Sequence, residues 1–180
     1  MKKTSKKNCF LEDIKISTIY SGIKNTPDNE DDLLLIELKK RSSIAGIFTQ
    51  SLTSSASVNQ CKKNILNSKD PAVRAILVNS GNANAFTGSQ GEETVLKISK
   101  FLSQKLNCSM NEIYTASTGV IGKQLDPNLI IKNLKLMKPL INQDWLRAAN
   151  AIRTTDKFAK VARRMCMIDG AEIEIVGIAK

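Results

Sequence analysis

"ILVNSGNANAFTG", residues 76–88, carries an apolar run into a loop that contains three asparagines and two glycines. The apolar residues before the loop predict a buried strand over residues 74–80. Behind the loop, residues 91–106 repeat apolar side chains at helical spacing, namely Val95, Ile98, Leu102 and Leu106. The stretch therefore predicts a strand, a polar loop and an amphipathic helix, as found in α/β domains.

The loop does not match a phosphate-binding pattern. It has neither the lysine nor the spacing of GxxxxGK[ST], and its glycines are spaced wrongly for GxGxxG. Two interpretations remain: turns built by asparagine side chains, or a tight polar pocket at the end of the strand. The side chains in question are Asn79, Asn82 and Asn84.

Further elements follow from apolar periodicity and from turn and capping residues. They are a hairpin made of residues 31–40 and 42–50, a helix over 55–68, a strand over 113–122 behind a Ser109/Glu112 capping box, a helix opened by Asp126-Pro127, a helix over 143–152, and a hairpin within 164–180 turning at Asp169-Gly170. Strands come partly as hairpins and partly separated by helices. This indicates an α/β (α+β) layered sandwich with mixed sheets, and not a doubly wound parallel sheet.

The composition fits one soluble domain. We expect residues 1–8 to be a disordered basic tail and residues 9–180 to form a single domain. No apolar run approaches the roughly 20 residues of a membrane helix, and no apolar segment follows the basic start, so we expect a cytoplasmic protein without membrane contact.

The net charge is +10, but the lysines are scattered and aromatic residues make up only 4% of the chain, which argues against nucleic-acid binding. A positive field also favours small anionic substrates such as amino acids.

The reactive residue types narrow the chemistry. The chain has no histidine, which excludes Ser-His-Asp and Cys-His catalysis and removes the commonest metal ligand. The four cysteines form no CxxC pair, so we interpret them as isolated thiols and expect no metal.

Two more loops combine hydroxyl groups with turn residues. In "STGVIG", residues 117–122, a hydroxyl residue followed by glycine can aim an O–H and a backbone N–H at one point, as an oxyanion hole requires. An ordinary Thr-Gly turn explains it equally well. "AIRTTDKFAK", residues 151–160, is by itself a helix that ends in a polar turn.

Taken together and in order, "VNSGNANAFTG", "ASTGVIG" and "IRTTDKFAK" resemble the signature segments of the ornithine acetyltransferase family, which is ArgJ-type. "SGIKNTPDNEDDLLLIELKKRSSIAGIFTQ" resembles the opening of that family. The resemblance extends from about residue 18 to the last residue.

The resemblance implies a glutamate N-acetyltransferase of arginine biosynthesis. Such a precursor cleaves itself before an internal threonine, and the α and β chains form an α2β2 heterotetramer. The new N-terminal threonine of β carries acetyl from N-acetylornithine to glutamate, in some members also from acetyl-CoA, and no cofactor takes part. Its own α-amino group can act as general base, which agrees with the absence of histidine.

The sequence ends at "VGIAK", where the family continues into a glycine-rich run and the cleavage threonine. It thus resembles most of an α chain without the nucleophile. A fragment, a processed chain and a degenerate gene all fit this end. The alternative to an enzyme is a non-catalytic α-like remnant that acts as a binding or scaffold module.

The resemblance also implies roles for individual residues. Thr118 and Gly119 match the oxyanion-hole pair, through a side-chain hydroxyl and a backbone N–H. Thr155 matches the substrate-binding threonine, with Thr154 as an open alternative. Lys180 matches a lysine that contacts substrate, where an ammonium suits a carboxylate.

The loop side chains Asn79, Asn82 and Asn84 are expected beside this site as positioning groups. Phe86 stands where the family has a small residue or cysteine, and could narrow the loop or pack beneath it.

Overall fold

The computed structural model describes residues 14–26, 28–140 and 143–180. The basic tail expected at residues 1–8 lies outside the described residues. In chain order the elements are β1 (Lys15–Ile19), β2 (Leu33–Ser43), α1 (Ala56–Leu66), β3 (Ala72–Asn82), α2 (Gly88–Leu106), the 3₁₀ turn η1 (Met110–Glu112), β4 (Ile113–Val120), α3 (Pro127–Leu136), α4 (Trp145–Ala151), β5 (Lys160–Ile168) and β6 (Ala171–Ala179).

Within the described residues, the strands form two sheets. The larger has the order β1-β2-β3-β4, in which only the β3–β4 pair is parallel, and β5 with β6 forms a separate antiparallel hairpin. This mixed α/β arrangement confirms the fold class predicted from the sequence.

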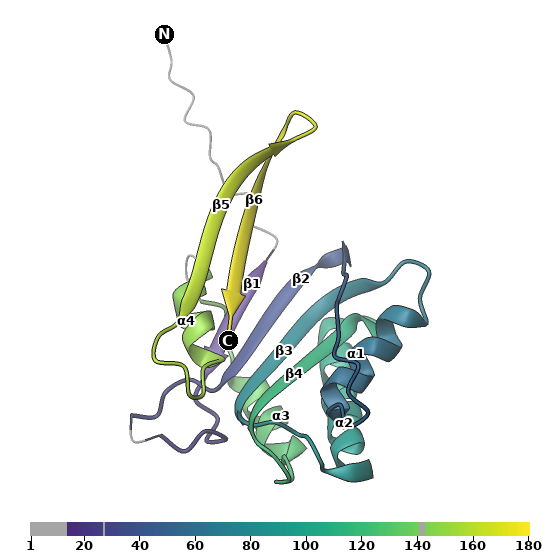
Figure 1. Cartoon of the computed structure of the whole chain (residues 1–180), viewed down its shortest axis with the longest axis vertical. Coiled ribbons are helices and arrows are strands. Elements are labelled where there is room, and N and C mark those ends of the chain that lie inside the picture. Colours follow the sequence, from purple (N-terminus) through teal and green to yellow (C-terminus); the bar gives the residue numbers. More distant parts are fainter. Residues whose placement is uncertain (1–13, 27, 141–142) are drawn as a thin grey trace.

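Helices cover both faces of the larger sheet (Figure 1). Leu33 and Leu35 of β2 belong to a cluster with residues of α2 and α3, whereas Leu34 belongs to a cluster with residues of α4. Successive side chains of a strand point to opposite faces, so a central strand covered on both sides is apolar at consecutive positions. Ile178 of β6 also packs on the α4 side, so the terminal hairpin lies over that face.

The hairpin predicted at residues 31–50 is wrong. Residues 33–43 form one strand, β2, whose register with β3 shifts between Glu37 and Ser42. Arg41 has a φ of 65° there, so the basic segment is an irregularity within a strand and not a turn between two strands. Residues 44–50 carry no helix or strand, and the antiparallel partners of β2 are β1 and β3.

The elements defined by local chemistry agree with the sequence. Ser55 caps α1 through a bond from the Val58 N–H, and Asp126 caps α3 with proline at its first position. Asp169 and Gly170 have φ values of 50° and 79°, as a two-residue hairpin turn requires. No helix in the described part of the chain is long and apolar enough to cross a membrane.

Candidate functional site

Three of the segments singled out in the sequence meet at two glycines. Gly81 of β3 lies opposite Gly119 of β4, and both have positive φ values, 100° and 135°. A Cβ on Gly119 would lie 2.3 Å from the carbonyl carbon of Gly81, and a Cβ on Gly81 would lie 2.7 Å from Lys24 Cα. The "SGIK" turn, the asparagine loop and the "STG" segment are thus stacked backbone against backbone, at distances that only glycine permits.

A buried carboxylate holds the "SGIK" turn in this stack. Asp32 has no exposed surface and accepts hydrogen bonds from the backbone N–H groups of Ser21 (2.7 Å) and Lys24 (2.8 Å). The Asp32 carbonyl accepts from the Ser80 N–H at 2.9 Å, which ties the same turn to β3.

The three loop asparagines are buried, and both ends of each amide are bound by the protein. Asn79 donates to Asn82 O at 2.8 Å and accepts from the Ser117 hydroxyl at 2.7 Å. Asn82 donates to Lys123 O at 3.0 Å and accepts from the Asn84 N–H at 2.8 Å. Asn84 donates to Gly91 O and accepts from the Thr87 hydroxyl. The amides therefore shape the loop, and Asn79 reaches the residue next to Thr118.

Thr118 and Lys180 line one cavity, although 62 positions separate them in the sequence. The cavity has a volume of about 370 Å³ and lies between β3, β4 and the end of β6. Its remaining lining is mostly apolar: Ile36, Ile76, Val78, Ala116, Ser117, Ile152 and Ile178. The structure thus brings together one predicted oxyanion donor and the predicted substrate cation, and Gly119 follows Thr118 directly.

The threonine pair lies at the exposed turn after α4. Thr155 is exposed and Thr154 is half-buried, and neither lines the Thr118 cavity. A hydrogen bond from Lys160 holds the pKa of the adjacent Asp156 below its ordinary value, and the charges of Lys160 and Lys180 act in the same direction. Lys180 is therefore close enough to interact electrostatically with this turn, and the substrate role of Thr155 stays a prediction.

Phe86 does not narrow the Thr118 cavity. Its side chain is 71% exposed, and it borders a different hollow with Asn84, Thr87 and Gly88.

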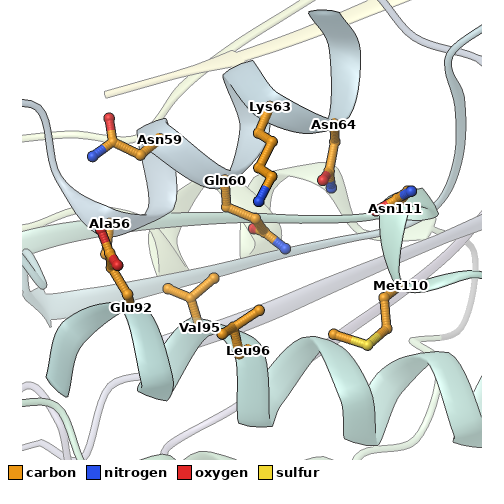
Figure 2. A pocket seen from close by; sticks show the side chains of 10 residues that line it. All are labelled: Ala56, Asn59, Gln60, Lys63, Asn64, Glu92, Val95, Leu96, Met110 and Asn111. Carbon is orange, nitrogen blue, oxygen red and sulfur yellow. The ribbon is translucent and has the colours of Figure 1, made fainter. Parts of the chain in front are cut away.

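A further hollow of about 240 Å³ lies between α1 and α2 (Figure 2). Gln60 and Asn64 line it from α1, and both side chains donate to the Ile113 carbonyl, at 3.2 and 3.1 Å. These amides fasten α1 to β4, so we assign them a structural role.

The described residues contain no group of three or more histidine, cysteine or acidic side chains that could hold a metal ion. Cys61, Cys108 and Cys166 are free thiols, and Cys9 lies outside the described residues.

Sequence reasoning missed Asp32 and Ser117. Its place at the start of the "STGVIG" segment was the only signal for Ser117, because its bonding partners lie far away in the sequence, at Ser57 and Asn79.

Known proteins resemble this chain in sequence and fold. Residues 15–180 match the ArgJ family. The chain is 40% identical over 171 residues to the arginine biosynthesis bifunctional protein ArgJ of Rhizobium meliloti (strain 1021), covering 94% of this chain and 40% of that protein. It is 42% identical to the ArgJ of Bartonella henselae, with the same coverage. The chain thus spans about two fifths of the length of these relatives.

Two solved structures share the fold. An arginine biosynthesis bifunctional protein ArgJ from Bacillus halodurans superposes with a TM-score of 0.84 at 24% identity, over 93% of this chain and 86% of that one. An ornithine acetyltransferase from Mycobacterium tuberculosis, solved in complex with ornithine, superposes with a TM-score of 0.73 at 24% identity, over 93% of this chain and 88% of that one. Because the family match runs through the described chain from β1 to Lys180, this chain belongs to the ArgJ family.

Proposed function

We propose that this chain is the α-chain portion of a cytoplasmic glutamate N-acetyltransferase, which moves acetyl from N-acetylornithine to glutamate in arginine biosynthesis. The main support is that Thr118 and Lys180 line one cavity. Membership of the ArgJ family and the names of the relatives point the same way.

In the proposed reaction, the nucleophile is the N-terminal threonine of a β chain cut from the same precursor. Its α-amino group takes the hydroxyl proton as the oxygen attacks the acetyl carbonyl. Thr118 and Gly119 donate to the oxyanion, and the C–N bond then breaks as the leaving amine of ornithine takes up the proton. The amine of glutamate attacks the resulting threonine ester in the reverse sense.

Substrate binding would use the charge at the cavity. The Lys180 ammonium is suited to the α-carboxylate that both amino-acid substrates carry, and Thr155 adds a hydroxyl from the adjacent turn. No cofactor enters the reaction, and acetyl-CoA is proposed only as a second acetyl donor.

Exposed apolar side chains on the β5–β6 hairpin support binding to a protein partner. Met165, Met167, Ile168 and Ile175 are each at least 45% exposed there. A solvent-exposed apolar surface of this kind marks an interaction site, which agrees with a β chain and an α2β2 assembly.

The test is expression of the complete gene, with mass spectrometry for self-cleavage and an acetyl-transfer assay. We expect two fragments, a β chain that begins with threonine, and transfer from N-acetylornithine to glutamate. An uncut protein that transfers no acetyl would contradict the proposal and favour a binding or scaffold module.

A further inference from the structure

β4 is an edge strand of the larger sheet, and side chains of α1 bind along its free edge. The Ile113 carbonyl accepts from Gln60 and Asn64, and the Thr115 carbonyl accepts from the Cys61 thiol at 3.3 Å. Burial raises the pKa of that thiol, which keeps it protonated as a donor. Helix α1 thus takes the place of a neighbouring strand.

The spacing of these contacts follows the geometry of both elements. Asn64 follows Gln60 by four positions and Cys61 by three, so the side chains that bind β4 come from one side of α1. On β4 the bound carbonyls belong to residues two apart, because alternate residues of a strand direct their backbone groups to the same edge. Residues 113, 115, 117 and 119 are alternate residues of β4. The last of them, Gly119, carries the N–H that is the second proposed oxyanion donor.

Ser117 makes the last side-chain contact of this series before the site. Its hydroxyl donates to Asn79 Oδ1 at 2.7 Å, and the Ser57 hydroxyl lies 3.1 Å from the same oxygen of Ser117. Because the Ser117 proton is used toward Asn79, Ser57 is the donor in that second bond. Ser57 and Asn79 are 2% and 3% exposed, so neither partner is free to exchange with water. One hydroxyl therefore joins α1, β4 and β3 at the residue next to Thr118.

We infer that Ser117 is a positioning residue that holds Thr118 and Gly119 in place as oxyanion donors. The inference rests on the proposed function. Among the hydrogen bonds described between α1 and β4, the next one lies at the Thr115 carbonyl, four residues before Gly119. A donor must lie about 3 Å from the developing oxyanion, and a displacement of about 1 Å can cost on the order of 100-fold in rate.

The test compares three variants of the complete protein. Ser117→Ala should lower kcat by about 10- to 100-fold with little change in KM, since a misplaced donor weakens transition-state binding alone. Ser117→Thr keeps the hydroxyl that bonds to Asn79, so most of the rate should return. Thr115→Val is the matched control: it removes a hydroxyl bond of 2.8 Å to Gln60, one step farther from the site. Its kcat should stay within about threefold of wild type, as expected of a loss that does not move the donors.

Hydrogen exchange of the Gly119 amide, measured by NMR, supplies a readout that needs no activity. Exchange should be faster in Ser117→Ala and unchanged in Thr115→Val. If Ser117→Ala does not fold, Ser57→Ala removes one bond of the same hydroxyl chain and should show the same kcat and exchange effects.

The outcomes separate the two proposals. An active wild type whose Ser117→Ala variant keeps its kcat overturns the positioning role alone, as does an equal loss of kcat in Thr115→Val. A wild type that transfers no acetyl overturns the proposed function; unchanged Gly119 exchange in Ser117→Ala then also removes the structural basis of the inference.

Discussion

At the scale of single residues, Thr118 and Gly119 are restricted to their residue types for different reasons. Thr118 lines the cavity, whereas Gly119 is constrained by the close approach of its backbone to Gly81. The first can therefore be tested by activity and the second by stability.

In the complete protein, Thr118→Ala should lower kcat by about 100- to 1000-fold and change KM much less, since the hydroxyl meets charge that develops only in the transition state. Steady-state kinetics measure this, with Thr118→Ser as the variant that retains much of the rate. Lys180→Ala should instead act mainly on KM, because a carboxylate contact exists in ground and transition states alike. A Thr118→Ala enzyme with kcat within about threefold of wild type would leave "STGVIG" as only a turn.

Gly119→Ala should prevent folding or lower the melting temperature severely. The new methyl would lie 2.3 Å from backbone carbon of β3, which has no flexible end that could move away. Gly122→Ala is the matched control, because Gly122 also has a positive φ, 79°, but a Cβ there would meet nothing within 4 Å. That control should cost only the backbone strain, about 1–3 kcal/mol. Equal melting temperatures for the two variants would contradict the close-approach argument.

At the scale of elements, α1 stabilises the sheet by satisfying the free edge of β4. Gln60 alone bonds to Ser99, Ile113 and Thr115, at 2.7, 3.2 and 2.8 Å. It therefore connects α1 to both α2 and β4. Its neighbour Asn59 is exposed and bonds to Ser54, just before α1.

Gln60→Ala should lower the free energy of unfolding by about 1–3 kcal/mol, since the Ser99 and Thr115 hydroxyls lose a partner in a mostly buried place. Chemical denaturation measures the difference. Asn59→Ala, the neighbouring control, should stay within about 0.5 kcal/mol of wild type, as exposed substitutions usually do. A comparable loss in both variants would contradict the role of the β4 edge, because alanine has the higher helix propensity and does not by itself destabilise α1.

At the scale of the whole molecule, the β5–β6 hairpin is covered on only part of its surface. Ile178 packs into the α4 cluster, but Ile173 and Ile175, which lie nearer the turn, are 38% and 53% exposed. A two-stranded hairpin is marginally stable by itself, so this part of the fold depends on whatever covers it.

Residues 1–180 alone should transfer no acetyl and should self-associate or bind a hydrophobic dye. Light scattering, dye fluorescence and the transfer assay measure these properties. Ile175→Thr should reduce the association, because it lowers exposed apolar area while keeping β propensity. A monodisperse monomer with a cooperative melt would contradict the need for a partner, and turnover by the pure chain would overturn the assignment of roles.

The sequence alone predicted those features that depend on residues close to one another in the chain. The cap of α3, the Asp169-Gly170 turn and the amphipathic helix after the asparagine loop all follow from local conformational preference. The site residues Thr118, Gly119 and Lys180 came from a resemblance in short segments. Local patterns and short motifs hold their information within a few positions of one another, so no contact between distant residues is needed to read them.

Tertiary structure alone decided the pairing of strands and the setting of the site. Consecutive apolar residues in β2 do not indicate which strands lie beside it, and for this reason the hairpin predicted over residues 31–50 is wrong. The bonds that join Ser117 to Ser57 and Asn79 span 60 and 38 positions, and the Thr118–Lys180 cavity spans 62. Such contacts form only when the chain closes long loops to bury its apolar faces. Which residues then meet depends on the packing energy of the whole core, and no short stretch of sequence contains that information.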